Sequence, residues 1–133
     1  MIAYESLVLE KYINFFSDKD SLYMHEDEEH PPRYIGVAFE FLCKISSSEL
    51  LVDYSDLYGN VFKDEKWLYV DSLESLTDEF VFSLTATQVV TILAAIRHKD
   101  LFCTGFFKLC GKTGSITRLL KQLKYVLERK ENI

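Results

Sequence analysis

The chain has 133 residues, with 15 Lys+Arg against 21 Asp+Glu and a formal net charge of −6. This length fits one domain and excludes two separate cores, and a content of 48% hydrophobic residues excludes a disordered chain. No apolar run is long enough for a transmembrane helix, and the N-terminus lacks the pattern of a signal peptide, so we expect a cytoplasmic protein with no membrane partner. The three cysteines, Cys43, Cys103 and Cys110, are an odd number and predict reduced, buried thiols.

The charge is divided unevenly along the chain. Residues 1–80 hold 18 acidic and 6 basic side chains, a net charge of −12, whereas residues 81–133 hold 3 acidic and 9 basic side chains, a net charge of +6. Two interpretations are open. Either one face attracts cations and another attracts anions, or the two sections attract each other across one fold.

The first 46 residues predict two helices separated by a loop. Apolar residues spaced three and four apart, from Val8 to Phe16, predict a helix at about 3–16. The acidic tract 25–30 is followed by Pro31 and Pro32, which cannot continue a helix, so it predicts a solvated loop that separates an N-terminal hairpin arm from the rest. The same helical spacing then predicts a helix at about 35–45.

The middle of the chain is the least regular part. The three serines 46–48 end the second helix and cap a third, which begins near Glu49 and ends at Gly59-Asn60. Residues 67–70 and 80–82 have the aromatic and β-branched composition of short strands, although helix turns also fit segments this brief.

The last third is strongly helical. Thr85 and Gln88 form a capping-box pattern that predicts a helix at 86–98, followed by a short helix at 101–109 capped by Gly111. A final helix at 115–130 has an apolar stripe and a basic side. The sequence thus predicts a mainly α-helical single domain over residues 1–133, with five or six helices and at most one or two short strands.

Two segments approach catalytic or ligand motifs but fail on spacing. Gly105 and Gly111 are separated by five residues, whereas a phosphate-binding loop requires four, so a helix cap is expected there. His25 and His30 are five apart and precede two prolines, which excludes the helical zinc-protease motif. We therefore expect no metal, no cofactor and no enzymatic activity.

The C-terminal third resembles a signature of small bacterial helical domains of unknown function. The pattern Arg-x-x-Asp-x-Phe-x-x-Gly is formed by Arg97, Asp100, Phe102 and Gly105, and a Gly-x-Ile-x-Arg-Leu start to the final helix follows at 114–119. The opening segment 9–16 also resembles the start of that family. The resemblance implies a small helical fold and says little about activity.

In size and charge the chain also resembles the immunity proteins that neutralise toxins of contact-dependent growth inhibition. That resemblance implies a basic toxin domain, such as a nuclease, as the protein partner, because an acidic surface with aromatic anchors can steer onto a nucleic-acid-binding site. The expected partner-binding residues are Tyr23, Glu26, Asp27, Glu28, Glu29, Asp53, Tyr54, Asp56, Tyr58, Asp64, Glu65 and Trp67.

A second function remains open from the sequence. A regulatory or nucleic-acid-associated module could place the basic side of the final helix on phosphates, through Arg118, Lys121, Lys124 and Arg129. The net charge of −12 over residues 1–80 would repel phosphates, so nucleic acid is the less favoured partner.

Overall fold

The computed structural model describes residues 2–46 and 73–131. These residues are mainly helical, as the sequence predicts, and contain one antiparallel pair of short strands. The elements in chain order are α1 (Ile2–Ser17), β1 (Met24–His25), β2 (Arg33–Tyr34), α2 (Gly36–Ser46), the 3-10 turn η2 (Leu73–Ser75), α5 (Asp78–Phe82), α6 (Ala86–Phe102), α7 (Phe106–Lys112) and α8 (Ser115–Glu131). The third predicted helix and the segment 67–70 lie outside the described residues.

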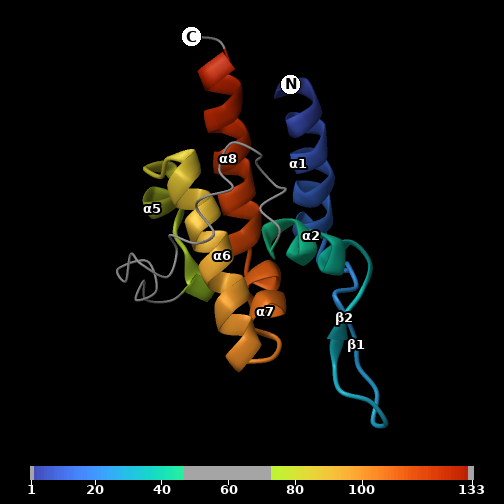
Figure 1. Ribbon diagram of the computed structural model, residues 1–133. Helices are drawn as coiled ribbons and strands as arrows, with labels where there is room; N and C mark the ends of the chain where they lie inside the picture. Colours follow the sequence, from blue (N-terminus) through green and yellow to red (C-terminus); the bar gives the residue numbers. More distant parts are fainter. Residues whose placement is uncertain (1, 47–72, 132–133) are drawn as a thin grey trace.

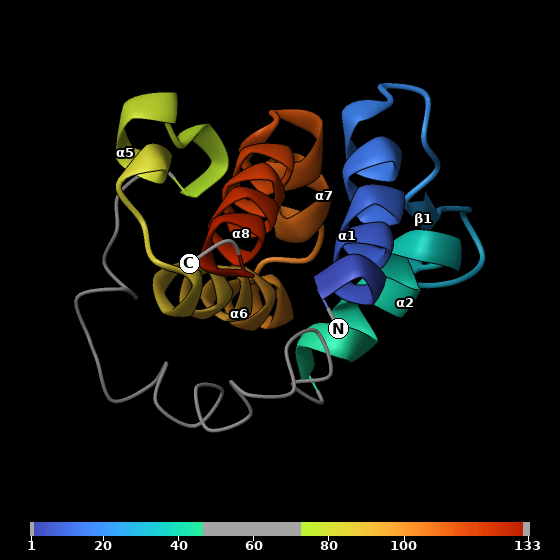
Figure 2. The ribbon, with the colours of Figure 1, turned by 90° about the horizontal axis from the view of Figure 1, so that it is seen from above.

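Helix α8 lies in the middle of the bundle, as Figures 1 and 2 show from two directions. It packs against α1 and α6 and also contacts α5 and α7. Its buried side chains recur at helical spacing and include Ile116, Leu119, Leu120, Leu123 and Leu127. The predicted apolar stripe is therefore the centre of the core.

Two buried polar side chains of α8 hold the segment before α6. The Gln122 amide donates to the backbone oxygens of Phe82 at 3.2 Å and Leu84 at 2.9 Å. The Ser115 hydroxyl accepts from the Leu76 backbone N–H at 3.1 Å. These bonds satisfy backbone groups that the short α5 and its flanks cannot pair internally.

The option of a strand at 80–82 is wrong, because these residues form the end of α5. The Thr77 hydroxyl accepts from the Phe80 N–H at 3.2 Å, and Asp78 and Glu79 place negative charge on the first turn. Both features stabilise a helix start. Composition at 80–82 fits a strand, but the cap at Thr77 decides the local conformation.

The predicted capping box is confirmed, and the break after it lies later than predicted. Thr85 and Gln88 exchange side-chain-to-backbone bonds of 3.2 and 2.9 Å at the start of α6. α6 continues to Phe102, and the chain turns at Gly105, whose φ is +93°. The cap predicted at Gly111 is wrong, because Gly111 lies inside α7.

The prediction of buried thiols holds for one cysteine. Cys110 is buried, and burial raises the pKa of its thiol to about 12, with the nearby Glu74 charge adding to the shift. Cys43 and Cys103 are exposed, which corrects the prediction for both. Cys103 is the residue that directly follows α6, in the turn that leads to α7.

An aromatic cluster joins α1, α2, α7 and the strand pair. Its ring centroids lie 5.1–6.4 Å apart in mostly edge-to-face and tilted contacts, a spacing typical of favourable aromatic pairs. The rings are those of Phe16, Tyr23, Tyr34, Phe41 and Phe107. The strand pair is thus packed onto the bundle at its base.

Candidate functional site

The acidic tract forms the tip of a β-hairpin that projects from the bundle (Figure 1). Met24 pairs with Tyr34 and His25 with Arg33, and every residue from His25 to Arg33 is exposed. The solvated loop predicted from the sequence is therefore present. The short strands that support it were not predicted.

Asp27 organises the tip. One carboxylate oxygen accepts the backbone N–H groups of Glu29 at 2.9 Å and His30 at 2.8 Å, and the other lies 2.8 Å from His25 Nε2. The side-chain bond from His25 and the backbone bond from His30 lower the pKa of Asp27. The carboxylate is therefore ionised at neutral pH and fixes the turn.

The remaining acids at the tip differ in how they are paired. Glu26 faces Lys108 of α7 at 3.4 Å. Within the described residues, Glu28 and Glu29 make no ion pair. Negative charge at the tip is therefore only partly neutralised by the part of the chain that the structure describes.

Asp100 on α6 fixes the base of the hairpin. The Tyr34 hydroxyl donates to Asp100 Oδ1 at 2.6 Å, and the same oxygen accepts the Phe107 N–H at 2.9 Å. The Lys108 N–H in turn donates to the Tyr34 hydroxyl at 3.2 Å. Burial, followed by the bond to Asp100, raises the pKa of Tyr34, so its hydroxyl stays protonated as a donor.

The hairpin does not present Tyr23 as an anchor for a partner, which corrects the prediction. Tyr23 is 1% exposed and belongs to the aromatic cluster. Its ring packs so closely on Gly111 that a Cβ there would overlap the Tyr23 hydroxyl and ring. The other predicted residues, Asp53, Tyr54, Asp56, Tyr58, Asp64, Glu65 and Trp67, lie outside the described residues.

An apolar groove that was not predicted lies at the base of the hairpin. It has a volume of about 320 Å³ and runs between β2, α2 and the end of α6. Phe39 and Leu101, which line it, are 55% and 62% exposed. Phe39 shares the helical spacing of the apolar residues in the predicted helix 35–45, and only the neighbouring elements show that it faces solvent.

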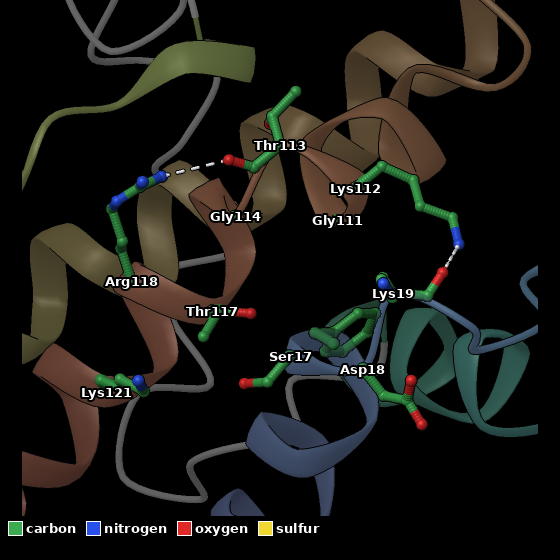
Figure 3. A pocket seen from close by; sticks show the side chains of 11 residues that line it. Ser17, Asp18, Lys19, Gly111, Lys112, Thr113, Gly114, Thr117, Arg118 and Lys121 are labelled. Atoms are coloured by element: carbon green, nitrogen blue, oxygen red, sulfur yellow. Dashed lines mark hydrogen bonds between the residues drawn. The ribbon is translucent and has the colours of Figure 1, made fainter.

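A second pocket, of about 360 Å³, lies where the end of α1, the end of α7 and the start of α8 meet (Figure 3). It is lined by residues 16–19 and 111–114 and by Thr117, Arg118 and Lys121. The glycine-containing segment that fails as a phosphate loop is thus part of a basic pocket. Gly114 has a φ of +91° and immediately precedes α8.

The four bases of the final helix do not form one surface. Arg118 and Lys121 line the pocket, whereas Lys124 lies 3.9 Å from Glu10 and 3.6 Å from Glu128. The Arg129 guanidinium lies over the Tyr125 ring at 6.0 Å. Acidic neighbours therefore interrupt a continuous basic track along α8.

The described residues contain no cluster of three or more His, Cys, Asp or Glu side chains placed to hold a metal ion. Nor does any helix among them combine the length and apolar character needed to cross a membrane. No family model, curated protein or solved structure matches the chain. The resemblance to immunity proteins therefore stays a hypothesis that rests on size and charge.

Proposed function

We propose that this chain is an immunity-type protein, which binds and neutralises a basic toxin domain through the acidic hairpin tip. The observation that carries the proposal is the pair of exposed carboxylates at Glu28 and Glu29, which no base neutralises within the described residues. Asp27 and Asp100 hold this tip in a fixed shape. A fixed negative projection loses little conformational entropy when it meets a cationic site.

The apolar groove supports the same function with a different kind of contact. Charge complementarity accelerates the encounter, but affinity depends on buried apolar anchors. Phe39 and Leu101 offer such surface beside Tyr34, at the hairpin base. Arg33 and Arg97 also line this groove, so recognition of a basic partner falls to the tip and apolar contact to the groove.

In this proposal the chain acts in the cytoplasm by covering the toxin's active surface, and it catalyses no reaction. A toxin nuclease must bind phosphates and therefore carries a basic site. A hairpin with several carboxylates occupies that site in place of the substrate. Protection then depends on binding alone.

The test starts from the gene immediately upstream: where that gene encodes a large secreted protein, the C-terminal domain of the protein is co-expressed with this chain. The variant Glu28→Lys/Glu29→Lys changes the tip charge and spares Asp27, which holds the turn, and Glu26, which pairs with Lys108. We expect this variant to lose protection of the host cells. The matched control, Asp20→Lys/Glu79→Lys, makes the same charge change at exposed positions and should still protect.

Binding kinetics distinguish long-range electrostatic attraction, which sets the association rate, from direct contacts in the complex. The association rate of the unmodified chain should fall as salt rises, and the rate of the tip variant should be slower and depend less on salt. Full protection by the tip variant, or equal loss in the control, contradicts the assignment of the hairpin. A harmless upstream domain contradicts the immunity function itself.

A further inference from the structure

The pocket at the start of α8 gathers positive charge from three separate elements. One cation comes from the residues after α1, one from the end of α7 and two from α8, as Figure 3 shows. They are Lys19, Lys112, Arg118 and Lys121. Because like charges repel, this grouping disfavours an empty pocket and favours a bound anion.

The single carboxylate of the lining does not cancel this charge. Asp18 accepts the Asp20 N–H at 2.9 Å, and in Figure 3 its carboxylate points away from Thr117. Among the described residues, Lys19 and Lys121 form no ion pair. Two full charges are therefore available to a ligand.

The other two cations are held in place. Arg118 keeps spare donors, whereas the Lys112 ammonium also lies over the Tyr23 ring, 4.9 Å from its centroid. The Lys112 ammonium donates to the backbone oxygens of Lys19 at 2.9 Å and Ser21 at 3.2 Å, which uses two of its three protons. Arg118 donates from Nε to Asp78 at 3.1 Å and from Nη1 to the Thr113 oxygen at 3.3 Å. Fixed cations with unused donors recognise an anion at low entropic cost.

Thr117 adds an observation that is independent of charge. Its buried hydroxyl has no hydrogen-bond partner within the described residues, and the oxygen points into the space enclosed by the pocket residues (Figure 3). A buried hydroxyl without a partner is unfavourable. A ligand oxygen that displaces the atoms covering this hydroxyl gains a bond that the free protein lacks, at the N-terminal end of α8, where the helix dipole is positive.

We infer that this pocket binds a small molecule that carries a phosphate group. The volume of about 360 Å³ lies near the lower end of the range for small-molecule sites, roughly 300–1,000 Å³. A bare phosphate would leave most of it empty, since a water molecule takes up about 30 Å³. Phe16, from the aromatic cluster, lines the same pocket and can contact the organic part.

A polynucleotide fits this arrangement less well than a small phosphate. The basic side chains are confined to the pocket. The next basic residue along α8, Lys124, lies beside Glu10 and Glu128. An extended strand would therefore leave the pocket onto acidic surface. The site is separate from the hairpin tip, and its ligand is independent of the proposed protein partner.

The test is calorimetric titration of the full chain with pyrophosphate and adenosine monophosphate, with adenosine as the matched probe that lacks phosphate. The phosphate-bearing probes should bind and adenosine should not. Lys121→Gln should weaken binding by about tenfold, as expected when a charged partner is removed. Arg129→Gln removes the same charge further along the same helix and should leave the affinity unchanged.

Two further variants distinguish binding through the specific contacts of the pocket from binding through positive charge in general. Thr117→Val removes the unpartnered hydroxyl, so it should weaken binding several-fold without lowering the stability of the free chain. Asp78→Asn releases Arg118 from its competing carboxylate and should tighten binding. The direction of each change in affinity follows from the contacts of the substituted residue and not from the net charge of the chain.

The proposal is overturned if neither phosphate probe binds below a Kd of about 10 mM, or if Lys121→Gln and Arg129→Gln weaken binding equally. A single-stranded RNA oligonucleotide provides the remaining comparison. RNA could instead bind more tightly than both small probes, with a steep salt dependence to which every basic residue of α8 contributes. That result would show that α8 binds a polyanion and would contradict the proposal.

Discussion

The Tyr23 hydroxyl is a buried polar group with no partner in the described part of the chain. Removing such a group relieves a desolvation cost, whereas removing a bonded hydroxyl loses about 1 kcal/mol. Tyr23→Phe should therefore be at least as stable as the unmodified chain in urea unfolding at neutral pH. Tyr12→Phe is the matched control, because the buried Tyr12 donates to Glu40 at 2.7 Å and should lose stability.

Tyr23→Phe should also differ from the unmodified chain in how its stability depends on alkaline pH. Burial raises the pKa of Tyr23 to about 12, above its ordinary value of 10.0. The unfolded chain then loses this proton first, so the stability contributed by Tyr23 is present below pH 10 and declines toward pH 12. Tyr23→Phe should gain about 2 kcal/mol over the unmodified chain across this window. A constant difference between the two proteins would contradict the burial effect.

Tyr23 also shows what sequence cannot supply at the scale of a residue. Its position before an acidic run fits a surface anchor, because tyrosine combines an apolar ring with a polar hydroxyl. Its ring can be buried because Gly111, which is remote in sequence, has no side chain and leaves room for it. Asp27 is the opposite case, since its bonds to residues 29 and 30 are local.

Asp100 connects three elements through one carboxylate oxygen. It accepts from Tyr34 of the hairpin and from the N–H of Phe107 in α7. Asp100→Ala should lower the free energy of unfolding by about 2 kcal/mol, because hydrogen bonds to charged groups are worth more than neutral ones. Amide exchange should accelerate in the hairpin and at the start of α7 before the rest of the bundle.

The control for Asp100 is Glu79→Ala, which removes an exposed carboxylate from the first turn of α5. It should change stability by less than about 1 kcal/mol. If Asp100→Ala left exchange in the hairpin unchanged, the aromatic cluster alone would be holding it. The hairpin that carries the Glu28→Lys/Glu29→Lys substitutions would then be held in place by packing and not by Asp100.

At the scale of elements, local signals were predictable and signals between elements were not. The Thr85 and Gln88 capping box is read correctly because both partners lie within one turn. The cap at Thr77 is equally local, but the strand-like composition of residues 80–82 concealed it. The break between α6 and α7 depends on Gly105, while Gly111 is required inside α7 by a distant ring.

At the scale of the molecule, the structure bears on both interpretations of the divided charge. Within residues 2–46 and 73–131, three ion pairs join the acidic section to the basic section, at distances of 3.1–3.9 Å. These pairs are Lys108–Glu26, Arg118–Asp78 and Lys124–Glu10. Attraction across the fold therefore occurs, yet Glu28, Glu29, Lys19 and Lys121 remain outside these pairs, at two separate sites.

These cross-fold pairs should contribute little to stability compared with the core. Their acidic side chains are 53–67% exposed, and exposed pairs are worth roughly 0–1 kcal/mol each. The triple variant Glu10→Gln/Glu26→Gln/Asp78→Asn should therefore lower the free energy of unfolding by less than about 2 kcal/mol in total. Leu123→Ala, a single change in the fully buried stripe of α8, should cost about 2–5 kcal/mol.

Urea unfolding of both variants at low and high salt decides this comparison. Salt should reduce the difference between the triple variant and the unmodified chain, because salt screens exposed charges. It should leave the cost of Leu123→Ala unchanged, because that substitution removes no charge. A triple variant less stable than Leu123→Ala would show that charge holds the two sections together. With the expected result, the bundle folds on its apolar core, and the charges of the hairpin tip and the basic pocket can be changed without unfolding it.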